Sequence, residues 1–351
     1  MSKPIVSICI PTYNRAMCLQ ECLSQTLAFQ GAGIEVIVSD NASEDDTRKI
    51  VSSFNDPRLK YFHNEENIGF VMNFFRALSH AEGEWVLFLS DEDYAVNLGE
   101  LLDTLSNIED GVVCVMGGEK GQKGNHKMGD EAAVGVGFTG LYVSGVILRR
   151  ATAEKYCDAF QWDSSERGLF PHQTLMLSMV TNDGDLFLLD FHVFWPGCTR
   201  GPNFMDKPNG YGNKHPVMCF QHFKIYSEIA VSNLKNNSLM IEKVSELWLY
   251  HAKRSVRWAK KRRFGVISTI EQFYDQSIVF MLGGIKFDDS ETQDLLMKEI
   301  DRKYHQLCIE NRFKINDIMR LFRVVEKKGR NFVGRVLRGL GVLRYLKKIA
   351  R

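Results

Sequence analysis

Short runs of β-branched and apolar residues alternate with amphipathic stretches through the first half of the chain, and this alternation restricts the possible folds more than any other feature. Strands are expected over five segments: Ile5–Ile10, Ile34–Val38, Leu59–Phe62, Trp85–Leu89 and Val112–Met116. The helical patterns between them cover residues 16–28, 46–54 and 70–81. Strands that alternate with helices predict an α/β fold with a largely parallel sheet and helices on both faces.

The second half of the chain changes character. Residues 117–140 are rich in glycine and predict an exposed loop or an irregular hairpin, and further strands are expected over Tyr142–Arg149 and Leu186–Phe191. Gly, Pro and Asn dominate residues 196–216, after which only helical patterns follow. We therefore expect an α/β domain over residues 1–200 and an all-helical domain over residues 201–351.

Charge and hydropathy limit the partners and the compartment. The 351 residues carry a net charge of only +1, which argues against a polyanion partner. Residues 253–263 form a basic helical stretch around Trp258, but no nucleic-acid motif accompanies it, so we expect no nucleic-acid partner. The start of the chain lacks a secretory signal pattern, and no apolar run reaches the roughly 18 residues that span a bilayer. These features predict a cytoplasmic protein.

Polar residues follow the first four expected strands. They occupy residues 11–15, 40–47, 64–69 and 90–93. Ligands of open parallel sheets bind beyond the carboxyl ends of the strands, so these segments are expected to form a site. Helix caps and turns need the same residue types, and Ser43 or Asp45 as a helix cap and Asn67–Gly69 as a turn stay open as alternatives.

Asp91 and Asp93 stand out among these residues. They lie one residue apart, with Glu92 between them, directly after the most apolar strand. So much negative charge repels itself unless a cation or a donor relieves it. Carboxylate oxygens are ligands that Mg²⁺ and Mn²⁺ accept together with water and substrate phosphates, so Asp91 and Asp93 are predicted to hold one of these ions.

Four motifs in this order resemble glycosyltransferase family 2, whose members have the GT-A fold. The motifs are Val6–Arg15, Val38–Ser43 with Asp46 and Thr47, Asn67–Gly69, and Ser90–Asp93. The resemblance is strong across residues 5–93 and fades beyond residue 110. It implies an inverting transferase that moves a sugar from a nucleotide-diphosphate donor to a hydroxyl of a saccharide or a lipid-linked saccharide, in the assembly of a bacterial surface polysaccharide.

The same resemblance implies roles for individual residues. Pro11, Tyr13 and Asn14 would line the nucleotide pocket, and their motif also contains Thr12 and Arg15 as donor-binding candidates. Asp40 would contact the base, and Asn67 would lie near the nucleoside. Asp91 would face the ribose and the metal, and Asp93 would bind the metal.

The general base departs from the family pattern. An Asp is usual near the start of a later helix, and His172 occupies that place in the segment Phe170–Leu175. The positive end of the helix dipole would lower the pKa of the imidazole and keep it able to accept a proton. Asp163 and Glu166 are alternatives, and His172 as a substrate-binding or packing residue stays open. A non-catalytic nucleotide-sugar-binding or scaffold protein of the same fold is the alternative function.

The C-terminal stretch is basic and amphipathic. Residues 327–351 contain nine Lys and Arg and no acidic residue, with apolar residues at helical spacing from Val333 to Leu346. Such a helix can lie on an anionic membrane, here the inner face of the cell membrane. Packing on the rest of the domain or on a second subunit of a homo-oligomer is the alternative, and amphipathicity alone does not choose between them.

Overall fold

A computed structural model describes residues 3–117, 124–136, 142–159, 171–197, 216–262, 264–285, 287 and 289–311. The chain forms two compact units, residues 1–300 and 301–351. The boundary between these units differs from the change in composition near residue 200, so the predicted division into domains stays a prediction. No helix within the described ranges is both long enough and apolar enough to cross a bilayer.

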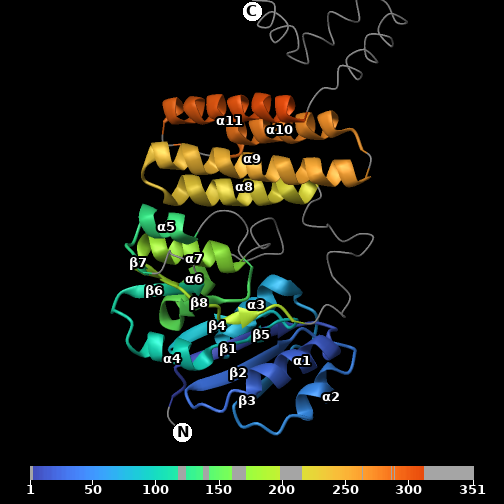
Figure 1. Cartoon of the computed structure of the whole chain (residues 1–351), viewed down its shortest axis with the longest axis vertical. Helices are drawn as coiled ribbons and strands as arrows, with labels where there is room; N and C mark the ends of the chain where they lie inside the picture. The colour runs from blue at the N-terminus through green and yellow to red at the C-terminus, as the bar shows by residue number, and fades with distance from the viewer. Residues whose placement is uncertain are drawn as a thin grey trace, which may run out of the picture. The chain divides into compact units, whose positions relative to one another are not determined.

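An eight-stranded sheet is the framework of the first unit (Figure 1). Its strands, in the order in which they lie side by side, are β3 (Leu59–His63), β2 (Ile34–Asp40), β1 (Val6–Thr12), β4 (Trp85–Phe88), β8 (Val146–Arg149), β6 (Val112–Gly117), β9 (Asp185–Leu189) and β7 (Gly124–His126). β3, β2, β1 and β4 pair in parallel, as do β6 and β9. The predicted α/β fold with a mostly parallel sheet is confirmed.

Helices cover both faces of this sheet, as the sequence predicts. The helices of the first half are α1 (Ala16–Leu27), α2 (Thr47–Ser52), α3 (Gly69–Ser79) and α4 (Leu98–Ser106). All seven residues of β1 are buried, and alternate residues serve opposite faces. Ile8 belongs to one core with the apolar residues of α1 and α4, whereas the Cys9 thiol reaches the Ala77 carbonyl of α3 at 3.4 Å.

The glycine-rich segment contains regular structure, so the expectation of a loop or irregular hairpin is wrong for part of it. β7 adds an antiparallel edge strand to β9, and α5 (Asp130–Val136) follows. α5 is only seven residues long and its contacts with the core are made by small residues, with Ala132 and Ala133 fully buried. A helix this short gives too few turns for its periodicity to be recognised in sequence.

Two short strands form a second sheet, and two further helices complete the α/β part of the chain. β5 (Tyr94–Ala95) and β10 (Phe194–Trp195) pair antiparallel in a separate two-stranded sheet. α6 (Arg150–Ala159) and α7 (Pro171–Asn182) lie between β8 and β9 in the sequence. The sequence patterns do not predict β5 or β10, because a two-residue strand has no measurable alternation.

Only helices are described after residue 216, as predicted. They are α8 (Pro216–Asn233), α9 (Asn237–Arg262), α10 (Val266–Gly283) and α11 (Ser290–Glu310). Within the first unit, α8, α9 and α10 pack against one another (Figure 1). Thr181 at the end of α7 donates to the Asn233 side chain at 3.1 Å, and Asp130 accepts the backbone amides of Lys235 and Asn236 at 2.9 and 3.0 Å. These bonds fix the α8–α9 turn beside α5 and the end of α7.

Candidate active site

The loops that follow β1 and β4 meet at the carboxyl ends of the strands. Thr12 ends β1, and its hydroxyl donates to Asp91 Oδ2 at 2.7 Å. Arg15, in the β1–α1 loop, lies 3.3 Å from Asp91 Oδ1 and 2.5 Å from Glu92 Oε2. Three of the predicted residues are thus brought together, and Asp91 is held by a hydroxyl on one oxygen and a guanidinium on the other.

The electrostatics of Asp91 and Asp93 reflect their burial. The two residues are only 4 % and 2 % exposed. Burial raises the pKa of Asp91 to about 6, despite the opposing effects of Arg15 and Thr12. Burial also raises the pKa of Asp93, and a hydrogen bond from Ser144 partly offsets it. The surrounding residues therefore compensate the two negative charges incompletely, which favours the binding of a cation.

Asp93 is held from a different side than Asp91. Ser144 donates to its Oδ2 at 2.6 Å, and the Gly197 backbone amide lies 3.4 Å from its Oδ1. The Tyr142 hydroxyl donates to Glu92 Oε1 at 2.8 Å. The Tyr142 side chain also interacts with the Asp93 carboxylate, and the backbone contact of Asp93 Oδ1 with Gly197 is long.

These donors suit Mg²⁺ or Mn²⁺. Such an ion commonly takes one or two carboxylates from the protein and completes its shell with water and substrate phosphates. No group of three or more His, Cys, Asp or Glu side chains suited to a metal occurs among the residues that the structure describes. The described residues can thus supply a carboxylate pair for a phosphate-bound ion, but not a closed site of protein ligands.

Asp40 and Asn67 belong to a polar network at the ends of β2 and β3. Asp40 accepts the Tyr61 hydroxyl at 2.5 Å and the Ser43 backbone amide at 2.9 Å, so its carboxylate also fixes the loop after β2. Asn67 Oδ1 accepts the Asn41 side-chain amide at 2.8 Å and the Gly69 amide at 2.9 Å. The bond from the Gly69 amide to the Asn67 side chain closes an Asx-turn at the start of α3, so Asn67 has a local structural role.

The loop after β1 is tied to the loop after β2. The Asn14 amide donates to the Ser43 hydroxyl, and the Asn14 side chain accepts the Glu44 amide, both at 2.8 Å. Asn14 and Ala42 adopt left-handed backbone conformations, with φ of 53° and 61°. Residues other than glycine rarely adopt this conformation, and it concentrates at functional sites. Tyr13 directly precedes Asn14 and is 41 % exposed, whereas Pro11 is buried.

Asp45 accepts backbone amides at two helix starts, although the N-cap residues are Asp46 for α2 and Arg15 for α1. Its Oδ1 accepts the Thr47 amide at 3.1 Å at the start of α2, and its Oδ2 accepts the Ala16 amide at 2.9 Å at the start of α1. Ser43 instead bonds Asn14. One carboxylate therefore serves the N-termini of two helices.

His172 lies in the first turn of α7, as the sequence predicts. It is 3 % exposed, and its ring lies 6.4 Å from that of Phe74 on α3. Phe74 in turn stacks on Phe88, the last residue of β4, with ring centroids 3.8 Å apart. The assignment of His172 as the base stays a prediction. Asp163 and Glu166, and the C-terminal stretch 327–351, lie outside the described residues.

Sequence reasoning missed the residues that hold Asp93. Ser144 and Tyr142 precede β8, which pairs antiparallel with β4, and Gly197 follows β10. An antiparallel strand places its start at the edge where parallel strands end. The polar pair Tyr142 and Ser144 at the start of the predicted strand Tyr142–Arg149 is the available signal, but a strand parallel to β4 would place its start at the opposite edge.

Comparisons with known proteins agree with this geometry. The sequence profile of glycosyl transferase family 2 matches residues 7–167. Abequosyltransferase RfbV of Salmonella typhimurium is 27% identical over 284 residues, covering 70% of this chain and 82% of that protein. GalNAc(5)-diNAcBac-PP-undecaprenol beta-1,3-glucosyltransferase of Campylobacter jejuni is 33% identical over 117 residues, covering 32% of this chain and 38% of that protein. The chain thus covers less than half of the length of several relatives. One of them is an uncharacterized protein of Mycobacterium tuberculosis, of which the match covers 29%.

Solved structures share the fold at low sequence identity. TarS 1–349 of S. aureus in complex with UDP-GlcNAc has a TM-score of 0.59 at 16% identity, covering 88% of this chain and 93% of that chain. Mannosyltransferase PcManGT of Pyrobaculum calidifontis, in complex with GDP-Man and Mn2+, has a TM-score of 0.53 at 15% identity, covering 86% and 88%. Residues 7–167 therefore contain a glycosyl transferase family 2 domain, and the chain has a GT-A fold.

Proposed function

We propose that this enzyme transfers a sugar from a nucleotide-diphosphate donor, with inversion, to a hydroxyl of a saccharide or lipid-linked saccharide of a bacterial surface polysaccharide. The observation that carries the proposal is the buried pair Asp91 and Asp93 at the edge where four parallel strands end. The name of one relative, a PP-undecaprenol glucosyltransferase, supports a lipid-linked acceptor, and the name of another, an abequosyltransferase, supports sugar transfer.

The nucleotide would bind across the ends of β1, β2 and β3. Tyr13 offers an exposed ring, and the ties between Asn14 and Ser43 hold the loop on which this ring stands. Asp40 and Asn67 lie in the network that shapes the neighbouring loops. A preorganised edge of this kind binds a ligand without first ordering its own loops.

Asp93, with Asp91, would hold Mn²⁺ or Mg²⁺. The bound ion would offset charge that develops on the diphosphate leaving group. Arg15 stands at the same place and now pairs with Asp91 and Glu92, so it can contribute positive charge to the phosphates as well. Thr12 keeps Asp91 oriented through its hydrogen bond.

His172 would accept the proton of the acceptor hydroxyl. Its place in the first turn of α7 exposes it to the positive end of the helix dipole, which favours the neutral imidazole that a base needs. Asp163 and Glu166 remain the alternatives for this role. Contact of residues 327–351 with an anionic membrane, and self-association, remain predictions.

The 3 % exposure of His172 favours one alternative function, a nucleotide-sugar-binding protein without turnover. A base must reach the acceptor hydroxyl within about 3 Å, directly or through one water. Because the His172 ring is buried, this access needs a movement of the protein, whereas a protein that only binds the donor needs none.

A panel of nucleotide sugars distinguishes the two functions. The full-length protein is incubated with each donor and Mn²⁺, with and without an acceptor extract, and both thermal stabilisation and release of the nucleoside diphosphate are measured. We expect one donor to stabilise the protein and to be consumed faster with acceptor. Stabilisation without release under any condition would identify the binding protein, and no response to any donor would reject both functions.

A further inference from the structure

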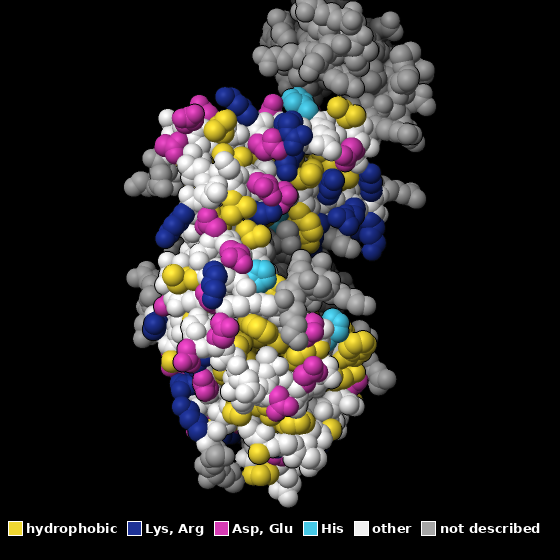
Figure 2. Space-filling view, turned by 60° about the vertical axis from the view of Figure 1, so that its left-hand side comes forward, with side chains coloured by type: hydrophobic (Ala, Val, Ile, Leu, Met, Phe, Trp, Pro, Cys, Tyr) yellow, Lys and Arg dark blue, Asp and Glu magenta, His cyan; other side chains and the backbone are white. Residues whose placement is uncertain are grey.

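The turn that joins α9 to α10 carries basic charge alone. Residues 247–270 contain seven Lys and Arg and no Asp or Glu. Four of the basic residues, Arg257, Lys260, Lys261 and Arg262, are exposed on the last turns of α9. We call these four residues, together with Phe264, the basic corner. Figure 2 shows Lys and Arg side chains gathered at one end of the helical region.

Within the described ranges, no carboxylate pairs with Arg257, Lys260, Lys261 or Arg262. Earlier on α9, Lys243 pairs with Glu242 at 2.8 Å and with Glu246 at 3.2 Å. Basic residues in the last turn of a helix interact favourably with its dipole. The helix dipole therefore explains why basic residues occur at the end of α9. It does not explain why the apolar ring of Phe264 is exposed among them.

Phe264 is the apolar part of the corner. Its side chain is 60 % exposed, although it stacks on Trp258 with ring centroids 5.2 Å apart. The Phe264 amide donates to the Ala259 carbonyl at 3.0 Å, which anchors the residue to the end of α9. A fixed aromatic ring surrounded by long cationic side chains matches the boundary between anionic headgroups and acyl chains, where both kinds of side chain are favourable.

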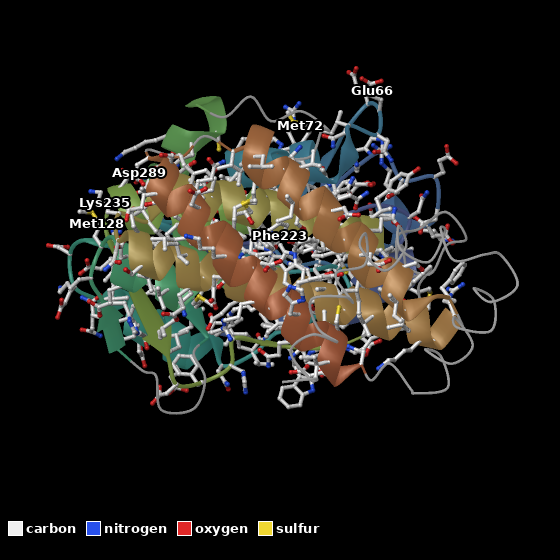
Figure 3. All side chains as sticks on the ribbon, turned by 90° about the horizontal axis from the view of Figure 1, so that it is seen from above. Glu66, Met72, Met128, Phe223, Lys235 and Asp289 are labelled. Atoms are coloured by element: carbon white, nitrogen blue, oxygen red, sulfur yellow. The ribbon has the colours of Figure 1, made fainter. Side chains whose placement is uncertain are left out.

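The basic corner lies toward the carboxyl ends of the parallel strands. This is the side of the first unit on which the donor is proposed to bind, and we call it the donor side. α9 starts at the turn fixed beside Asp130 and is about 39 Å long, so its last residues lie far from that turn. Figure 3 shows Lys235, at this turn, on the opposite side of the view from Glu66, which precedes Asn67 at the donor edge. The end of α9 therefore points to the side on which the strands of the sheet end (Figures 1 and 3).

We propose that the basic corner docks this protein on an anionic lipid bilayer. The interaction is additional to sugar transfer and uses residues that the donor site does not. A bilayer in contact with the corner would lie on the donor side, where a membrane-held acceptor could reach it. A nucleic acid fits less well, because the chain as a whole has a net charge of only +1 and the corner offers a single exposed ring rather than a stacking groove.

Vesicle sedimentation of the full-length protein tests the proposal. The vesicles contain phosphatidylcholine alone or three parts phosphatidylcholine to one part phosphatidylglycerol, in 0.15 M NaCl, about physiological ionic strength. The variant K260E/K261E/R262E should bind the anionic vesicles at least about 100-fold less, since each basic residue near such a surface contributes roughly a fivefold gain and each introduced Glu adds repulsion. Phe264→Ser should weaken binding about tenfold.

A matched control separates local from overall charge. K49E/R76E/K235E changes the net charge by the same amount at three exposed residues elsewhere and should change binding less than about threefold. Equal losses in both triple variants, or an unmodified protein that ignores anionic vesicles, would overturn the proposal. Donor hydrolysis by K260E/K261E/R262E should equal that of the unmodified protein, so the result does not depend on the proposed function.

Hydrogen exchange locates the contact even if other segments also bind lipid. Amides of residues 258–268 should exchange more slowly when the full-length protein is bound to anionic vesicles. Vesicle binding without protection there would contradict the proposal. Binding of single-stranded RNA in 0.15 M NaCl, as strong as binding to vesicles and lost in K260E/K261E/R262E, would assign the corner to nucleic acid instead.

Discussion

Replacing Asp93 by Asn should separate the catalytic value of its charge from its structural role. Asn has nearly the same shape and keeps an oxygen that can accept the Ser144 hydroxyl, now at 2.6 Å. Only the negative charge is lost. A unit charge about 4 Å from another, at an effective dielectric constant of about 20, is worth roughly 4 kcal/mol. We therefore expect turnover to fall about 10²- to 10³-fold at saturating Mn²⁺.

Stability should change in the opposite direction. Because burial raises the pKa of Asp93, its ionised form costs free energy in the folded protein at neutral pH. Asp93→Asn removes that cost, so the metal-free variant should melt at or above the temperature of the unmodified protein at pH 7.5. Below the unfolded-state pKa, near pH 3.8, Asp93 is protonated in both states and the advantage should vanish.

Release of nucleoside diphosphate and thermal melting measure the two effects. Glu92→Gln is the matched control, because it removes the same charge from the adjacent residue, which contacts Arg15 and Tyr142. Turnover of the control should fall less than about tenfold. Turnover of Asp93→Asn within threefold of the unmodified enzyme, or an equal loss in Glu92→Gln, would refute the reasoning.

Three further predictions concern neighbouring groups. Burial raises the pKa of Asp91 to about 6, so Mn²⁺ affinity measured by calorimetry should fall as the pH drops through 6. An affinity that does not change between pH 7.5 and pH 5 would contradict a role of Asp91 in metal binding. His172→Ala should reduce kcat about 10²-fold or more with little change in donor Kd, and unchanged kcat would direct the search for the base to Asp163 or Glu166. Trp195 is 54 % exposed and pairs with Tyr94 beside Asp93. Trp195→Ala should therefore raise KM for the acceptor about tenfold and leave donor Kd unchanged. A change in donor Kd alone would show that Trp195 contacts the donor instead.

The parallel part of the fold could be predicted because its signal is local. β1, β2 and β4 are fully buried strands, and such strands read as continuous apolar runs. The polar residues after them, such as Thr12 and Asp91, follow from the rule that parallel strands end at one edge. The sequence therefore predicts which residues approach one another there.

The rest of the site depends on chain reversal and on distant segments. Ser144 reaches Asp93 because β8 runs antiparallel to β4. The alternation of apolar and polar residues along a strand does not reveal the direction in which the strand runs. Gly197 contacts Asp93 from a segment 104 residues away. His172 lies on a helix buried on all sides from Pro171 to Thr181, and the neighbours that bury it, such as Phe74 on α3, come from other segments that periodicity within α7 does not reveal.

The carboxylate pair at the end of β4 is the centre of the account, and a crystal grown with Mn²⁺ and the nucleoside diphosphate of the best donor tests it most directly. Diffraction at the manganese absorption edge locates the ion. We predict an anomalous peak about 2.1 Å from an Asp93 carboxylate oxygen, with the diphosphate on its open side and the nucleoside beside Tyr13. A bound diphosphate at another edge of the sheet, or a manganese ion without contact to Asp91 or Asp93, would contradict the account.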